Sequence, residues 1–246
     1  MNRSRSSYKF LYAAITLFFI SCGGAEEKST TDTTTTADTM AVVTPPAAAN
    51  TIISTPQHMV IIRHKVADFA KWHVAYDGHD SARLANGLHS YVIGRGVEDS
   101  NMVMLAIKAD DLSKAKAFSK DPGLKQAMQK GGVTGTPRVQ FVTTFFQDTL
   151  VLSTPIRSMT LFTVKDKEAW TKSFDDGKQE RTDNGISTRV IATDADDNKK
   201  IMLVTALMDT AKARAYWNSD ALKKRREAGG VIGMPERFVF RVVKRY

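Results

Sequence analysis

Histidine is the residue type whose distribution points most directly to chemistry. All five histidines of the chain lie between residues 58 and 89, and histidine is the side chain best suited to proton transfer or metal ligation near neutral pH. His64 is expected at the end of one strand and His89 at the start of the next, on either side of a helix. Both side chains could then reach one cavity, so we predict them as candidate catalytic bases. The alternative is a chance cluster of surface histidines.

A row of aromatic and polar side chains occupies one face of the helix between these strands. Its members follow the spacing i, i+3, i+7, i+10, i+14, which places them on one helix face: Phe69, Trp72, Tyr76, His79 and Arg83. In one interpretation Trp72 and Tyr76 belong to the core, and Arg83 interacts with the dipole at the helix C-terminus. In the other, a pocket lies between helix and sheet, and Trp72, Tyr76, His79 and Arg83 contact a small aromatic or acidic ligand.

Two further groupings carry less chemical information. His73, Asp77 and Asp80 share a helix face, but their number and type are incomplete for a metal site, so neither a metal nor another cofactor is predicted. The glycine-rich segment 131–137 leaves a helix and enters a strand, whereas a phosphate-binding loop leads into a helix. We interpret this segment as a turn.

The elements that must position these residues occur twice in the chain. An offset of 98 residues aligns residues 66–137 with 164–235 without a gap. The matches include Trp72 with Trp170, Arg83 with Arg181, Asn86-Gly87 with Asn184-Gly185, and Gly131-Gly132-Val133 with Gly229-Gly230-Val231. Beyond Pro137 a slip of one residue improves the match, pairing Arg138 with Arg237 and Phe141 with Phe240. We interpret the pattern as an internal duplication.

Each copy predicts six elements in the same order. In the first copy they are a strand at 58–66, a helix from Asp68 to about Asn86, strands at 88–94 and 102–108, a helical segment at 112–130 and a strand at 139–146. In the second they are a strand at 158–164, a helix from Asp166, strands near 186–192 and 201–207, a helix at 210–227 and a strand at 238–243. The order β-α-β-β-α-β is that of the ferredoxin-like fold, within the α+β class.

A sheet of this kind carries helices on one face, so its other face needs a cover. We expect repeat 1 (57–147) and repeat 2 (157–246) to cover each other as an intramolecular barrel, a pseudo-dimer, joined by residues 147–156. The alternative is that each copy pairs with another molecule. Because repeat 2 has no histidine, repeat 1 is the predicted site and repeat 2 its structural partner.

The shared motifs are Val-x-Asp-x-x-x-Trp, Arg-x-x-Asn-Gly and Gly-Gly-Val-x-Gly-x-Pro. With them the chain resembles the antibiotic-biosynthesis-monooxygenase-like branch of the dimeric α/β-barrel superfamily, over residues 58–146 and 157–246. The resemblance implies the barrel fold. For activity it implies a range that includes cofactor-free monooxygenases, haem-degrading enzymes and small-molecule cyclases. The histidines and Trp72 are compatible with haem, but no spacing requires it.

The N-terminal segment predicts export. Basic residues precede an apolar run from Phe10 to Ile20, which is shorter than the about 20 residues of a membrane-spanning helix, so residues 1–21 are predicted to be a secretory signal. Phe19-Ile20-Ser21-Cys22 resembles a bacterial lipobox, which makes Cys22, the single cysteine, the predicted lipidation site. Residues 22–56 are rich in Thr, Ala and Pro and are predicted to be a disordered tether. An ordinary cleaved signal is the alternative.

The predicted location is therefore a bacterial cell envelope, with the folded part outside the cytoplasm and a lipid in the membrane. The net charge of +9 does not favour a nucleic-acid partner, because a basic run such as residues 223–226 is usually a solvated helix face. The predicted function is binding of a small apolar or aromatic molecule in repeat 1. Alternatives are a cofactor-independent monooxygenase or isomerase acting in the same pocket, a haem-handling protein, or two solidly packed structural copies.

Overall fold

The computed structural model describes residues 50–246. The predicted secretory signal, Cys22 and most of the predicted tether lie outside the described residues. The end of the predicted tether is wrong, because Ile52–Ile53 form strand β1, which pairs with the strand that ends at Asp148. None of the described helices is long and apolar enough to span a bilayer.

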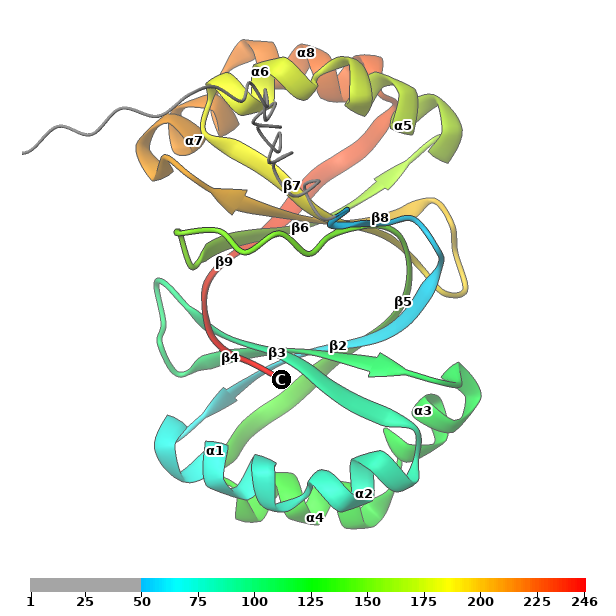
Figure 1. The fold of residues 1–246 in the computed structure, drawn as a ribbon, viewed down its shortest axis with the longest axis vertical. Coiled ribbons are helices and arrows are strands. Elements are labelled where there is room, and N and C mark those ends of the chain that lie inside the picture. Colours follow the sequence, from blue (N-terminus) through cyan, green and yellow to red (C-terminus); the bar gives the residue numbers. More distant parts are fainter. Residues whose placement is uncertain (1–49) are drawn as a thin grey trace, which may run out of the picture. The chain divides into compact units, whose positions relative to one another are not determined.

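The described residues contain two halves with the same order of elements (Figure 1). The first half comprises β2 (Gln57–Val66), α1 (Phe69–Gly78), α2 (Asp80–Ala85), β3 (Leu88–Gly96), β4 (Met102–Ala109), α3 (Leu112–Phe118), α4 (Pro122–Lys130) and β5 (Val133–Asp148). The second half comprises β6 (Ile156–Val164), α5 (Lys167–Asp176), α6 (Lys178–Asp183), β7 (Ile186–Asp194), β8 (Lys200–Leu207), α7 (Thr210–Trp217), α8 (Asp220–Ala228) and β9 (Val231–Arg245). The predicted α+β, ferredoxin-like order is confirmed in both halves.

The helix boundaries follow from local capping, with two corrections. The predicted continuous helix at 210–227 is divided at Asn218 and Ser219 into α7 and α8. The Asp68 carboxylate accepts the Lys71 amide at 2.8 Å and begins α1 as predicted, and Gly87 ends the helical segment at a φ of +66°. The prediction of one continuous helix to Asn86 is wrong, because the helix breaks at His79 into α1 and α2. The second half breaks at the equivalent Gly177.

The strands of the two halves close into one barrel, as predicted for the fold. In the described part of the chain, nine strands form an antiparallel sheet in the order β1-β5-β2-β4-β3-β9-β6-β8-β7. The long strand of each half then pairs with the other half: β5 with β7, and β9 with β3. These pairings join the ends of the sheet, with β1 left beside β5. Helices α1–α4 cover the outer face of the first half of this barrel, and α5–α8 cover the outer face of the second half (Figure 1).

The sheet register corrects two details of the predicted repeat. Ile62 pairs with Val139 and Thr160 pairs with Arg237, so the offset of 98 residues persists through the last strand and the predicted slip is wrong. The glycine-rich segment 131–137 is not a simple turn either. From Val133 onward it is part of β5, and the pairing with β2 is irregular between Arg63 and Lys65.

The apolar side chains divide between the barrel interior and the two helix–sheet interfaces. The interior contains methionines from both halves together with Phe240. The first interface is built around Trp72 and the second around Trp170 and Tyr216. Residues Ala48–Tyr246 therefore have their own core, which is what independent folding requires.

Candidate functional site

A small cavity lies between the helices and the sheet of the first half. It has a volume of about 80 Å³. Most of its wall is apolar. Four of its polar residues, His64, Tyr76, His79 and Arg83, belong to the histidine-containing segment 58–89. Its lining includes Ile62, His64, Trp72, Tyr76, His79, Arg83, Phe118 and Met128.

His64 is the most unusual group of this cavity. It is at the end of β2, only 4% exposed, and neither ring nitrogen has a hydrogen-bond partner among the described residues. Its ring lies 5.5 Å from the Trp72 ring, at an angle of 59°. Burial lowers the pKa of His64 from 6.5 to about 4, so the imidazole is neutral at physiological pH, with one donor and one acceptor nitrogen.

The second half shows that the imidazole is not needed for packing. Phe162 occupies the position equivalent to His64 and lies 5.4 Å from Trp170, at an angle of 58°. The two ring pairs therefore have the same geometry with different chemistry. A buried polar group that an apolar one replaces in the same packing costs free energy unless it finds a partner.

Trp72 and Tyr76 belong both to the core and to the cavity wall. Their rings stack at 5.2 Å, and Trp72 is 3% exposed. The Tyr76 hydroxyl is 2.8 Å from the Ser90 hydroxyl. Burial raises the pKa of Tyr76, partly offset by the nearby Arg83, so its phenol stays protonated. The two interpretations of the aromatic row are therefore not exclusive.

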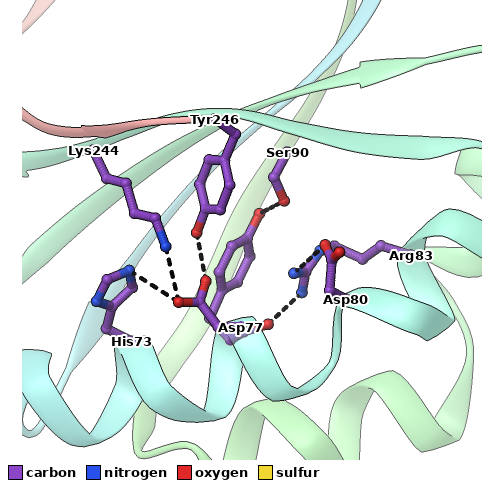
Figure 2. A network of polar contacts seen from close by, with 8 residues as sticks. His73, Asp77, Asp80, Arg83, Ser90, Lys244 and Tyr246 are labelled. Carbon is purple, nitrogen blue, oxygen red and sulfur yellow. Dashed lines mark hydrogen bonds and ion pairs between the residues drawn. The ribbon is translucent and has the colours of Figure 1, made fainter.

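Arg83 stabilises the helix break (Figure 2). Its guanidinium lies 3.7 Å above the Tyr76 ring and donates to the Tyr76 carbonyl at 2.7 Å and to Asp80 at 2.9 Å. Arg181 repeats this contact, 3.5 Å above Phe174 and bonded to the Phe174 carbonyl. Because both halves share this arrangement, it explains the two arginines without a ligand.

The two remaining predicted histidines lie in different places. His79 is at the junction of α1 and α2, lines the cavity and stacks on Phe118 at 6.3 Å. His89 does not reach the cavity, so the expectation that it shares one with His64 is wrong. Side chains alternate along a strand, and because Leu88 and Ser90 face the helices, His89 points away and binds Asp110 at 2.9 Å on the surface.

The row His73, Asp77 and Asp80 does not converge on one point (Figure 2). Asp77 accepts hydrogen bonds from Lys244 at 2.9 Å and from the Tyr246 hydroxyl at 2.6 Å, while Asp80 binds Arg83. These carboxylates are already engaged. No group of three or more potential metal-ligating side chains occurs among residues 50–246.

A groove adjoins the cavity at His64. It has a volume of about 740 Å³ and is lined from both halves, with His64 and Lys65 on one side and Trp217 and Arg237 on the other. His64 lines both spaces. A ligand could therefore place an apolar part in the cavity, contact His64, and extend into the groove.

The cavity does not fit a haem. Pockets that enclose ligands of that size have volumes of about 300–1,000 Å³, whereas the cavity has about 80 Å³. Two imidazoles, those of His64 and His79, line this space, and it is too small for the ring system that either would ligate.

Sequence reasoning missed several cavity residues. Phe118 on α3 and Met128 on α4 line the cavity and were not predicted, and neither was Ser90, which lies outside the lining and pairs with Tyr76. The pairing of Ser90 with Tyr76 depends on where β3 lies below α1, which local sequence does not specify. A comparison of the two copies at the offset of 98 residues could have indicated Phe118 and Met128, because Tyr216 and Arg226 replace them in the second copy.

Comparison with known proteins supports the fold. Neither a protein-family model nor a curated protein sequence matches the chain significantly. Among solved structures, the chain is similar to a proposed monooxygenase from Fusobacterium nucleatum subsp. nucleatum, with 13% identity and a TM-score of 0.51 over 77% of this chain and 93% of that one. It is also similar to an anthrone oxidase-like protein, with 15% identity and a TM-score of 0.52 over 78% of this chain and 94% of that one. At these identities the likeness establishes a shared fold.

Proposed function

We propose that the first half binds a small, largely apolar molecule that carries one hydrogen-bonding group. The observation that supports this most directly is the His64 imidazole, which is buried, neutral and without a partner among the described residues. A hydroxyl or carbonyl group of a ligand would restore the missing hydrogen bond and offset part of the desolvation cost of burying the ring.

The low pKa of the His64 imidazole favours a role in binding over a role in catalysis. A general base works best when its pKa lies near the operating pH, whereas burial lowers the pKa of His64 to about 4. No carboxylate orients the ring, since neither nitrogen has a partner in residues 50–246. His64 is therefore better suited to recognising a ligand than to removing a proton from it.

The ligand must be small or must extend beyond the cavity. An apolar cavity of about 150 Å³ holds benzene, and the cavity here has about 80 Å³. A single ring would fit if half-buried neighbours such as Phe118 or Met128 moved, or if part of it occupied the adjoining groove. The contact at His64 is available in either case.

Phenol and toluene form a matched pair of probes, because they have the same number of heavy atoms and differ in the hydroxyl group. We expect residues 48–246 to bind phenol about tenfold more tightly than toluene, followed by NMR titration of the Trp72 indole signal. The variant His64→Phe carries the residue found at the equivalent position of the second half. It should lose the preference for phenol over toluene and still bind toluene. Equal affinity for both probes in the wild type would contradict the proposal.

The second candidate is a cofactor-independent monooxygenase or isomerase in the same pocket. Its support is that His64 is neutral and borders both the cavity and the groove, and that one similar structure is an anthrone oxidase-like protein. Oxygen uptake with anthrone tests it in His64→Ala and His89→Ala variants. An enzyme would lose turnover and keep substrate affinity in His64→Ala, and since His89 lies on the surface, His89→Ala serves as the control.

We further propose that the chain is a duplicated lipoprotein of a bacterial cell envelope. Its support is the sequence: the pattern Phe19-Ile20-Ser21-Cys22 after an apolar run, and the 98-residue offset between the halves. Residues 57–147 and 157–246 would be the duplicated domains, held outside the cytoplasm by a lipid on Cys22. Incorporation of labelled palmitate into the wild type, and its loss in Cys22→Ser, is the expected result. Equal labelling of both proteins would contradict the lipid anchor.

A further inference from the structure

The second half contains a cavity at the equivalent place, with a different lining. It lies between α5–α8 and the sheet and has a volume of about 90 Å³. Three apolar positions of the first cavity carry polar groups here: Phe118 is replaced by Tyr216, Ala127 by Arg225 and Met128 by Arg226. At one position the polar residue belongs to the first half: His64 of the first cavity is replaced by Phe162 in the second.

The wall of this cavity carries positive charge without a matching negative charge. Four arginines line it, and no aspartate or glutamate does: Arg181, Arg225, Arg226 and Arg237. Arg225 forms an ion pair with Glu180, which does not line the cavity, and its Nε atom lies 2.6 Å from Glu180 Oε2. Arg181 stabilises the helix break. Arg226 and Arg237 have no ion-pair partner among the described residues.

These two guanidiniums are held at a cost in free energy. Burial and the proximity of Arg226 lower the pKa of Arg237 to about 10. The Arg237 guanidinium stacks 3.9 Å above Trp217, and its buried Nε atom has no hydrogen-bond partner in the described part of the chain. Val139, the equivalent of Arg237 by sheet register, shows that an apolar residue fits this strand position.

Two further features accompany the arginines. Tyr216 is 5% exposed, and its hydroxyl makes no hydrogen bond of normal geometry within residues 50–246, although burial and the nearby Glu180 raise the pKa of its phenol. At the helix break, Gly177 replaces His79, and a Cβ atom there would lie 2.8 Å from Arg225 Cδ. The loss of the His79 side chain therefore makes room for Arg225, so the exchanges are structurally coupled.

We propose that this second cavity, together with the adjoining groove that Trp217 and Arg237 also line, binds a small organic carboxylate. Arg226 and Arg237 would bind the carboxylate, because guanidinium groups match its planar geometry, and the Tyr216 hydroxyl would donate to it. The rings of Phe162, Trp170 and Trp217 would contact its apolar part. This proposal differs from the prediction that repeat 2 is the structural partner of repeat 1, and it does not depend on a ligand in the first half.

Benzoate and its neutral isostere benzamide test the proposal by calorimetric titration of residues 48–246. We expect benzoate to bind at least tenfold more tightly than benzamide. Arg226→Met and Arg237→Val, which restore the residues of the first half, should each weaken benzoate binding at least tenfold. Lys224→Met, which removes a charge from the exposed face of the same helix outside the cavity lining, is the matched control and should leave benzoate affinity unchanged.

Thermal unfolding distinguishes a binding role from a structural one. Removing a partly buried charge that has no ion-pair partner should leave the melting temperature of the Arg226→Met and Arg237→Val variants unchanged or raise it, while affinity falls. Lower melting temperatures with unchanged benzoate affinity would show that the arginines are structural and would overturn the proposal. Equal binding of benzamide and benzoate to the wild type would overturn it as well.

Discussion

At the position shared by His64 and Phe162, the two halves carry rings of different chemistry in the same packing. Both rings pack on a tryptophan with nearly the same distance and angle. The imidazole brings a hydrogen-bonding group into an apolar wall, and the phenyl ring brings none. The chemical difference between the two cavities therefore rests on side chains exchanged within one backbone geometry.

Burial of His64 predicts a pH dependence of stability. Below pH 6.5 the unfolded chain binds a proton at this residue, whereas the folded chain does not until about pH 4. Stability is therefore lost as the pH falls from 6.5 to 4, by about 2–3 kcal/mol at pH 4.5 relative to pH 7.

Urea unfolding of residues 48–246 and of His64→Phe at the two pH values measures this contribution. The carboxylates are common to both proteins, so the variant should lose about 2–3 kcal/mol less stability on acidification than the wild type. An equal loss in both proteins would mean that His64 is protonated in the folded state.

Between elements, the contact of β3 with β9 depends on a missing side chain. A Cβ atom on Gly94 would lie 2.3 Å from the Phe240 ring, and Phe240 is 1% exposed. The second half uses Ala192 and Val142 at the equivalent positions. A small residue thus faces a large one in one pair, and two residues of intermediate size meet in the other.

Gly94→Ala should therefore destabilise the protein by about 1–3 kcal/mol through overpacking. The double variant Gly94→Ala/Phe240→Val reproduces the other pair and should be at least about 1 kcal/mol more stable than the sum of the single changes predicts. Urea unfolding of the four proteins completes the cycle. Additive effects would show that the two residues do not contact each other.

The elements were more predictable than the breaks and side-chain directions within them. The order of elements along each half and the N-caps Asp68 and Asp166 follow from local patterns and from the repeat, and they were predicted correctly. The break at His79 was not, because it depends on Arg83 folding back over Tyr76. Arg225 and Arg226 were missed for a similar reason: in sequence they continue a basic helix face, and only the sheet below α8 makes them part of a cavity.

At the scale of the whole described unit, barrel closure leaves few unpaired strand edges. β5 and β9 each cross into the other half, and a closed barrel offers no open sheet edge for a second chain. We expect residues 48–246 to be monomeric. Light scattering coupled to size-exclusion chromatography checks this, and a dimer would show that closure within the chain competes with exchange of strands between chains.

The C-terminal residues add a polar clamp to this closure. Tyr246 and Lys244, at the end of β9, donate hydrogen bonds to Asp77 on α1 (Figure 2). The last strand of the second half is thereby tied to the first helix of the first half. Desolvation opposes ionisation of Asp77, but the bonds from Tyr246 and Lys244 outweigh it and lower its pKa. The clamp is therefore complete above the ordinary pKa of 3.8 and is lost as the pH falls through the lowered value.

Asp77→Asn and Tyr246→Phe should each lower the free energy of unfolding at pH 7 by about 0.5–1 kcal/mol, since the contacts are partly exposed. The double variant should lose less than the sum, because both changes break the same bond. Asp175→Asn is the matched control, because Asp175 is the equivalent of Asp77 in the second half. The equivalent of Tyr246 is Asp148, which cannot donate a hydrogen bond to Asp175, so this variant should keep the stability of the wild type. If Asp175→Asn is as destabilising as Asp77→Asn, the effect belongs to the helix and not to barrel closure.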